Sequence, residues 1–209
     1  MFKDRSDAAR QLAQQLAPYK GLHPLVLAIP RGAAPMGQII ATALQGQLDV
    51  VLVHKLCAPH LREVAIGAID ETGRAWLSPH AAGMGATADY VQTEEQKQLQ
   101  VLRERRRRYT AVHPPVSARD RLVIVVDDGL ATGATMMAAL TTLRQHHPAK
   151  LVCAVPVASP ETLEKIRPLA DEVVCLSAPP DFEAVGQFYQ RFPQVEDDEV
   201  VAILSQGTG

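Results

Sequence analysis

The sequence predicts an α/β fold with an open, mainly parallel sheet flanked by helices. Apolar runs of strand length alternate with helical patterns along the 209-residue chain, as expected when helices cover a parallel sheet. Residues 123–126 are all β-branched without a polar interruption, which is typical of a central strand buried on both faces. Two acidic residues and a loop of small residues follow this run directly. We therefore expect one domain, residues 1–209, with a polar site at the end of its central strand.

The segment before the central strand contains the patterns of two helices and two strands. Ser6 or Asp7 is the expected cap of the first helix, which ends before Pro18 and Gly21. The second helix starts with Pro35, a residue well suited to a first helical turn. The expected elements after the first helix are a strand at 25–29, a helix at 35–44 and a strand at 50–54 that leads into Lys55.

Between residues 57 and 117 the sequence predicts an insertion made of a β-hairpin and a charged helix. The hairpin strands are expected at 64–69 and 74–77, around the turn Glu71-Thr72-Gly73, and the helix at 90–109. Behind the central strand, the expected elements are a helix from Met136, a strand at 151–157, a helix at 161–169 and a strand at 172–176. Residues 181–206 are expected to form a loop and a helix that cover the site.

The stretch VIVVDDGLATGAT, residues 123–135, combines two carboxylates with a loop of small residues at the start of a helical pattern. Asp127 and Asp128 stand at the carboxyl end of the strand, the edge at which open parallel sheets bind ligands. Adjacent carboxylates accept hydrogen bonds from vicinal hydroxyls, and free amides at a helix N-terminus attract phosphate. The spacing therefore predicts a site for a phosphorylated pentose. Alternatively, the acids are ordinary loop residues and the threonines cap the helix.

This stretch resembles the substrate motif of type I phosphoribosyltransferases, which transfer ribose 5-phosphate from phosphoribosyl pyrophosphate (PRPP). The resemblance implies that fold, with a small hood at residues 177–209, and assigns Asp127 and Asp128 to the ribose hydroxyls. It assigns the 5′-phosphate to the loop formed by Ala131, Thr132, Gly133, Ala134 and Thr135. The sequence has neither the G-x-x-x-x-G-K-[ST] motif for nucleoside triphosphates nor the G-x-G-x-x-G motif for dinucleotides.

A second loop, from Pro30 to Pro35, also connects an apolar strand to a helix through small residues. The resemblance implies that this loop binds pyrophosphate through Arg31 and Gly32 and that the Pro30–Arg31 bond matches a cis peptide of the family. Lys55 ends the strand expected at 50–54, so its ammonium is expected to project into the same crevice and contact pyrophosphate. The alternative interpretations are a helix-entry turn with Arg31 in solvent, and a surface lysine at the end of a strand.

The wider resemblance covers nearly the whole chain and rests on the segments PRGA, KLCAP, AIGAID and DFEAVGQFYQRFPQV. It points to a bacterial group of phosphoribosyltransferases of unassigned acceptor, some of which are joined to hydrolase domains. Cys57 departs from the pattern, since glycine is expected at that position. In this resemblance the segment 57–117 takes the place of the family's flexible catalytic loop.

Residues for the acceptor are less well defined by the sequence. Phe182 follows Pro179-Pro180-Asp181 and could stack on a planar base, or it could instead anchor an apolar tail. Ala131 stands where the hypoxanthine-guanine branch of the family carries an aspartate for the purine. The resemblance therefore implies a different acceptor, with Glu63 or Glu71 as candidate acid-base groups.

Composition and charge favour a cytoplasmic enzyme without a membrane or nucleic-acid partner. The net charge of -2 provides no general attraction to nucleic acid, and an odd number of cysteines, three, fits a reducing compartment. The run of arginines within residues 103–108 shares its helix with glutamates and is expected to be solvated surface. An RNA-binding regulator is the interpretation that depends on this run.

The function implied by the resemblance is transfer of ribose 5-phosphate from PRPP to a small nitrogenous acceptor, with release of pyrophosphate. The catalytic residues would be Asp127, Asp128, Arg31 and Lys55. Mg²⁺ would be held mainly by PRPP and water, and the protein would form a homo-oligomer, expected to be a dimer. The alternative function is a regulator that binds PRPP or a nucleotide and has lost turnover.

Overall fold

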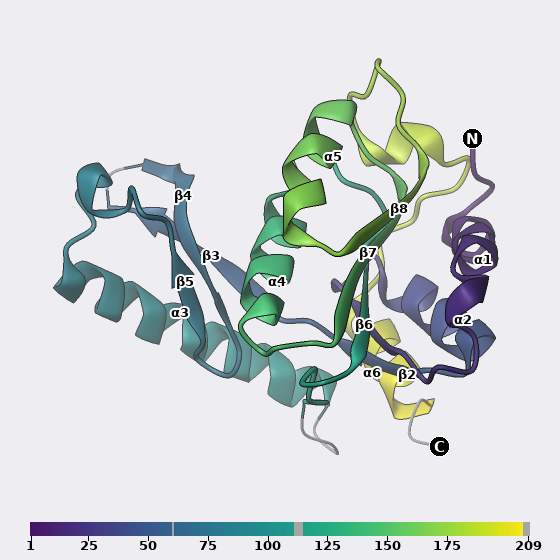
Figure 1. Ribbon diagram of the computed structural model, residues 1–209, viewed down its shortest axis with the longest axis horizontal. Coiled ribbons are helices and arrows are strands. Elements are labelled where there is room, and N and C mark those ends of the chain that lie inside the picture. Colours follow the sequence, from purple (N-terminus) through teal and green to yellow (C-terminus); the bar gives the residue numbers. More distant parts are fainter. Residues whose placement is uncertain (60, 111–114, 207–209) are drawn as a thin grey trace.

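The computed structural model describes residues 1–59, 61–110 and 115–206, and of residues 61–64 it describes the backbone alone. Its larger sheet consists of five parallel strands (Figure 1). Their spatial order is β2 (Gln47–Val50), β1 (Leu25–Ala28), β6 (Leu122–Val126), β7 (Lys150–Val157) and β8 (Glu172–Ser177). The α/β class and the open, mainly parallel sheet expected from the sequence are confirmed.

The central strand β6 is buried on both faces, as its β-branched residues predict. Val123, Ile124, Val125 and Val126 are each 0% exposed. Even and odd positions along the strand belong to two separate apolar cores, one on each side of the sheet. Since successive side chains of a strand point to opposite faces, a continuous apolar run is what a strand between two helical layers requires.

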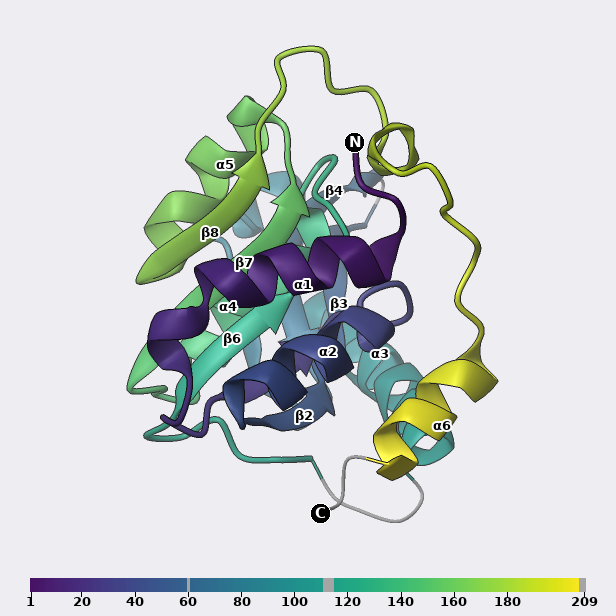
Figure 2. The ribbon, with the colours of Figure 1, turned by 90° about the vertical axis from the view of Figure 1, so that its right-hand side faces the viewer.

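The two helical layers that form these cores lie on opposite faces of the sheet, and Figure 2 views the sheet from the side of α1 and α2. One layer consists of α1 (Arg5–Gln15) and α2 (Ala34–Leu44), and the other of α4 (Ala134–Arg144) and α5 (Pro160–Ile166). The cap of α1 is Asp4, whose Oδ1 accepts from the Asp7 amide at 3.0 Å. The expectation of Ser6 or Asp7 was therefore wrong, because the helix starts one turn earlier than its apolar face.

A smaller antiparallel sheet and a long helix form the insertion between β2 and β6. The strand order is β3 (Val53–Ala58), β4 (Leu61–Asp70) and β5 (Ala75–Leu77), followed by α3 (Ala88–Tyr109). Figure 1 shows that this sheet and part of α3 extend away from the main sheet. The expected hairpin and charged helix are confirmed, and β3 is an additional strand that pairs with β4.

The strand expected at 50–54 was wrong, because the chain changes sheets within this apolar run. The Val51 amide still donates to the carbonyl of Ala28 in β1, at 3.1 Å. One residue later, the carbonyl of Leu52 accepts from the amide of Glu71, which belongs to the insertion, at 3.3 Å. Both pairings bury apolar side chains, so no polar residue marks the position at which the chain passes from one sheet to the other.

After β8 the chain returns across the N-terminal segment and then forms α6 (Asp197–Gln206) (Figure 2). The Phe2 amide donates to the carbonyl of Phe188 at 2.8 Å, and the Gln190 amide donates to the carbonyl of Phe2 at 2.9 Å. The short 3₁₀ helices of the chain are Ala17–Tyr19, Ala82–Met84, Arg167–Leu169 and Val185–Phe188. Within the ranges that the structure describes, no helix has both the length and the apolar character needed to cross a bilayer.

Candidate active site

Two loops meet at the carboxyl edge of the main sheet, between β1 and β6. The chain leaves β1 through α2 toward β2 on one side, and leaves β6 through α4 toward β7 on the other. Such a reversal of strand order opens a crevice beyond the strand ends. At this point a Cβ atom on Gly32 would lie 2.1 Å from Oδ2 of Asp128. The structure therefore brings together the two loops that the sequence predicted as the ribose and pyrophosphate sites.

Asp127 and Asp128 form an adjacent acid pair in a partly buried position at the end of β6. Oδ1 of Asp127 accepts from the amide of Asp128 at 2.9 Å. Burial and the neighbouring carboxylate of Asp128 raise the pKa of Asp127 well above its usual value. Burial also raises the pKa of Asp128, although the Arg5 guanidinium opposes this increase. Asp127 is therefore the member of the pair that is protonated more readily.

Arg5, from the first turn of α1, is a site residue that the sequence analysis missed. Its Nε and Nη2 lie 2.9 and 2.8 Å from Oδ2 of Asp128. Its Nη1 donates to the carbonyl of Pro193 at 2.6 Å, and its guanidinium carbon lies 3.8 Å from the ring centroid of Phe192. The available signal was its position, because the helix dipole disfavours a cation in the first turn unless another contact compensates.

The loop from Ala131 to Thr135 forms the N-terminal end of α4, as expected. Gly133 is the cap residue and has a φ of 68°, in the left-handed region that favours glycine. Thr162 of α5 fixes the loop, because its Oγ1 donates to the carbonyl of Ala131 at 2.6 Å. Thr132 and Thr135 are exposed. First-turn amides have no carbonyl partner within their helix, so this loop can donate to an anion.

Arg31 and Lys55, the two cations expected to contact pyrophosphate, lie in different parts of the structure. The Pro30–Arg31 peptide bond is cis, as the resemblance implied. The Arg31 side chain is exposed, and its Nη1 lies 3.6 Å from Oε2 of Glu196. Lys55 does not end a strand of the main sheet. It lies within β3 of the smaller sheet, opposite Ala68, so the reason for placing it in the crevice was wrong.

Phe182 lies beside the phosphate loop, in the segment that follows β8. It lines a cavity of about 530 Å³ that also includes Ala131 and Thr132. Its ring packs against Phe188, with the ring centroids 5.1 Å apart. A planar group bound there would therefore contact both an aromatic ring and the loop, while Phe188 holds that ring in place.

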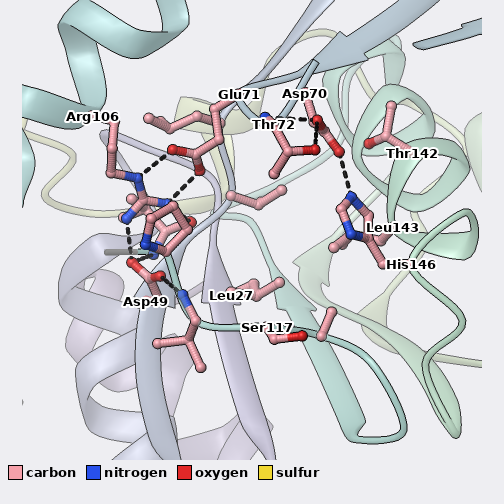
Figure 3. Close-up of a pocket in the computed structure, with 16 residues that line it drawn as sticks. Leu27, Asp49, Asp70, Glu71, Thr72, Arg106, Ser117, Thr142, Leu143 and His146 are labelled. Atoms are coloured by element: carbon pink, nitrogen blue, oxygen red, sulfur yellow. Dashed lines mark hydrogen bonds and ion pairs between the residues drawn. The ribbon is translucent and has the colours of Figure 1, made fainter. Parts of the chain in front are cut away.

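Glu71, one of the two glutamates expected as an acid-base group, does not line this cavity. Glu71 lines a separate pocket of about 290 Å³, shown in Figure 3, where it pairs through both oxygens with Arg106. Burial raises the pKa of Glu71, against the opposing effect of the Arg106 charge. The side chain of Glu63 lies outside the described residues. Glu71 therefore serves a structural ion pair in this pocket.

Arg106 also corrects the interpretation of the arginine run as solvated surface. Its side chain is 10% exposed and its Nη1 lies 2.7 Å from Oδ1 of Asp49, a side chain that is 1% exposed. Its Nη2 donates to the carbonyl of Val50 at 2.9 Å. Its neighbours Arg105 and Arg107 are exposed, as expected for a charged helix face.

Comparison with known proteins decides which family has this arrangement. The phosphoribosyl transferase domain family matches residues 2–192. The chain belongs to the phosphoribosyltransferase family. The fold implied by the sequence resemblance is thereby confirmed, since the acid pair, the phosphate loop and the loop after β1 all lie within the matched residues.

Relatives of this member of the family are similar along nearly its whole length. Proteins from two strains of Mycobacterium tuberculosis, named provisionally as phosphoribosyl transferases, are 42% identical over 207 residues. The match covers 99% of this chain and 47% of theirs, so the chain spans about half the length of these relatives. A crystal structure of the Thermus thermophilus protein TT1426 is 46% identical, with a TM-score of 0.93 over 100% of this chain and 99% of that one.

Proposed function

We propose that this phosphoribosyltransferase transfers ribose 5-phosphate from PRPP to a nitrogen acceptor and releases pyrophosphate. The observation that carries the proposal is the close approach of the acid pair to the Gly32 loop, with the N-terminus of α4 following the acid pair in the chain. Asp127 and Asp128 accept hydrogen bonds from the ribose hydroxyls. Residues 131–135 hold the 5′-phosphate, and the loop of Arg31 and Gly32 holds the diphosphate.

In the proposed reaction the bond between ribose C1 and the diphosphate oxygen breaks, and its electron pair leaves with pyrophosphate. The lone pair of the acceptor nitrogen forms the new bond to C1, and the nitrogen loses a proton to a base or to water. Positive charge develops on the ribose and negative charge on the leaving group. Arg31, exposed beside the crevice, stabilises the departing diphosphate, while the ionised carboxylate of Asp128 fixes the ribose.

The acid pair suits a Mg²⁺ ion that arrives with PRPP. Hard carboxylate oxygens are ligands that Mg²⁺ accepts directly or through water, and the ion neutralises diphosphate charge when it is bound. The ion would be held mainly by PRPP and water, and would reach Asp127 and Asp128 only through water. Across residues 1–59, 61–110 and 115–206, no group of three or more histidine, cysteine or acidic side chains is arranged to hold a metal.

The acceptor is proposed to bind in the cavity between Phe182 and the phosphate loop. Ala131 lines this cavity, and its methyl group can neither donate nor accept a proton. A site built to hydrogen-bond a ligand atom discriminates strongly, whereas an alanine at that position cannot. Hypoxanthine and guanine are therefore expected to be poor acceptors.

A pyrophosphate-release assay with PRPP and Mg²⁺, across purine, pyrimidine and other nitrogen acceptors, tests this function. We expect release with at least one acceptor, and a kcat/KM for hypoxanthine and guanine below that of the best acceptor. PRPP binding without consumption would instead favour the regulator, which keeps the fold and binds PRPP without turnover. If hypoxanthine or guanine reacted fastest, the argument from Ala131 would be wrong.

Gly133→Ala tests the phosphate loop. The new Cβ would lie 2.5 Å from Cγ2 of Thr162, and the φ of 68° is unfavourable for alanine. We expect PRPP binding to weaken by at least about tenfold, with a stability loss of about 1–2 kcal/mol. Isothermal calorimetry and thermal melting measure the two effects. Gly83→Ala is the matched control, because a Cβ at Gly83 meets nothing within 4 Å. Equal PRPP affinity in both variants would contradict the assignment.

A further inference from the structure

We propose that Arg5 is a positioning residue for the ribose of PRPP, which holds one oxygen of the Asp128 carboxylate so that the other oxygen faces the substrate. The inference rests on the proposed function and adds a residue to that site. It starts from the asymmetry of the contact, because both nitrogens of Arg5 bind the same atom, Oδ2.

The remaining oxygens of the acid pair are open to a ligand. Oδ2 of Asp128 is held by Arg5 and Oδ1 of Asp127 by a backbone amide. Between described residues, no hydrogen bond ends on Oδ1 of Asp128 or Oδ2 of Asp127. The Asp128 side chain is 15% exposed, and no buried side-chain oxygen among those residues lacks a partner, as expected if both atoms are accessible. The pair therefore presents one acceptor atom from each carboxylate, which matches two vicinal hydroxyls.

Arg5 is itself fixed by the tail that follows β8. Its guanidinium packs on the ring of Phe192 and donates to the carbonyl of Pro193. The tail is paired with the N-terminal segment through Phe2, and Figure 2 shows the two segments side by side. The side chain is 11% exposed. A guanidinium held from both sides can orient a carboxylate without being reoriented by solvent.

The charges around Asp128 make this contact necessary. Asp127 faces it from the same strand end, the hydroxyl of Tyr189 approaches from the tail and donates to the carbonyl of Asp128, and Arg5 approaches from α1. The loop after β1 contributes Gly32, which has no side chain. Among these groups Arg5 is the cation. Without it, burial would raise the pKa of Asp128 further, and a neutral carboxyl accepts a hydrogen bond from a hydroxyl more weakly than a carboxylate does.

Arg5→Met and Arg5→Lys test the inference by PRPP calorimetry from about pH 8 to about pH 5. Removing the cation raises the pKa of Asp128, so Arg5→Met should lose PRPP binding at a higher pH than the wild-type protein. At a pH below the pKa of Asp128 in both proteins, its affinity should be about tenfold weaker for each unit of that increase. Arg5→Lys keeps the charge and should recover most of the wild-type pH profile. Protonation of PRPP itself affects every variant equally. The ratio of variant to wild-type affinity at each pH therefore reports on the protein site alone.

Arg191→Met is the matched control. Arg191 also joins the tail to the N-terminal segment, through Asp4 at 2.7 Å, but its contact is away from Asp128. It should leave the pH profile of PRPP binding unchanged. If it shifted the profile as Arg5→Met does, a general loosening of the tail would explain both and the inference would fall. If the wild-type protein bound no PRPP, the proposed function would fail. If it bound PRPP and Arg5→Met matched it at every pH, the function would stand and Arg5 would have no such role.

Discussion

Asp128→Asn is expected to weaken PRPP binding by about a hundredfold while the protein remains folded. The amide keeps the shape of the side chain but removes the charge that accepts hydrogen bonds from hydroxyls, and such charge-assisted bonds contribute about 1.5–3 kcal/mol each. The substitution also leaves Arg5 without its ionic partner. Both effects act at the same point, where the proposed ribose site and the tail meet.

Isothermal calorimetry with PRPP and a thermal melt measure the two parts of this prediction. Asp120→Asn is the matched control, because Asp120 is an exposed aspartate whose left-handed backbone, with a φ of 55°, asparagine also accepts. It should bind PRPP as the wild-type protein does. An Asp128→Asn variant with unchanged affinity would show that the ribose does not bind at this carboxylate.

Arg106→Met should have the largest effect on stability, a loss of about 3–5 kcal/mol near neutral pH. The variant keeps the apolar part of the side chain but leaves the carboxylates of Asp49 and Glu71 buried without a cation. In the pocket of Figure 3 these two acids come from β2 and from the turn after β4, so Arg106 joins α3 to both sheets. Urea unfolding at equilibrium measures the loss.

The loss should become smaller as the pH falls. Burial already raises the pKa of Glu71 in the folded protein, and without Arg106 that pKa would rise further. A folded-state pKa above the unfolded value means that protonation favours the folded state, so acid restores part of the variant's stability. Arg107→Met, one position along on the exposed side of α3, should change stability by less than about 0.5 kcal/mol. A loss for Arg106→Met equal to that of Arg107→Met would show that the buried pairing contributes nothing.

The sequence was sufficient where one physical requirement dominates a segment. Four β-branched residues in succession can be buried on both faces in a central strand, and the acids after them fall at its carboxyl end for that reason. The same reasoning found the loop at Gly133, where a small residue begins a helix. Local pattern and tertiary environment agree at these positions, so the sequence analysis and the structure coincide.

The sequence was insufficient where a residue acts through a distant partner. Arg5 contacts a residue 123 positions away, and no local pattern records that pairing. Arg106 looked like its exposed neighbours because burial of a single arginine depends on carboxylates from two other elements. Lys55 was misplaced because an apolar run continues across the change from one sheet to the other. In all three cases the deciding interaction is made between elements.

The close approach of Gly32 to Asp128 has a consequence for how the two loops respond to ligands. Because an added Cβ on Gly32 would lie only 2.1 Å from Oδ2 of Asp128, the two loops are packed closely, and neither can move toward the other without displacing its neighbour. Any ligand that shifts one loop therefore changes the energy of binding at its neighbour, and thermodynamic linkage makes that influence mutual. Under the proposed function, binding of the pyrophosphate half of PRPP would change the affinity of the site for the ribose 5-phosphate half, and the reverse. The two halves of the donor would then bind as a coupled unit.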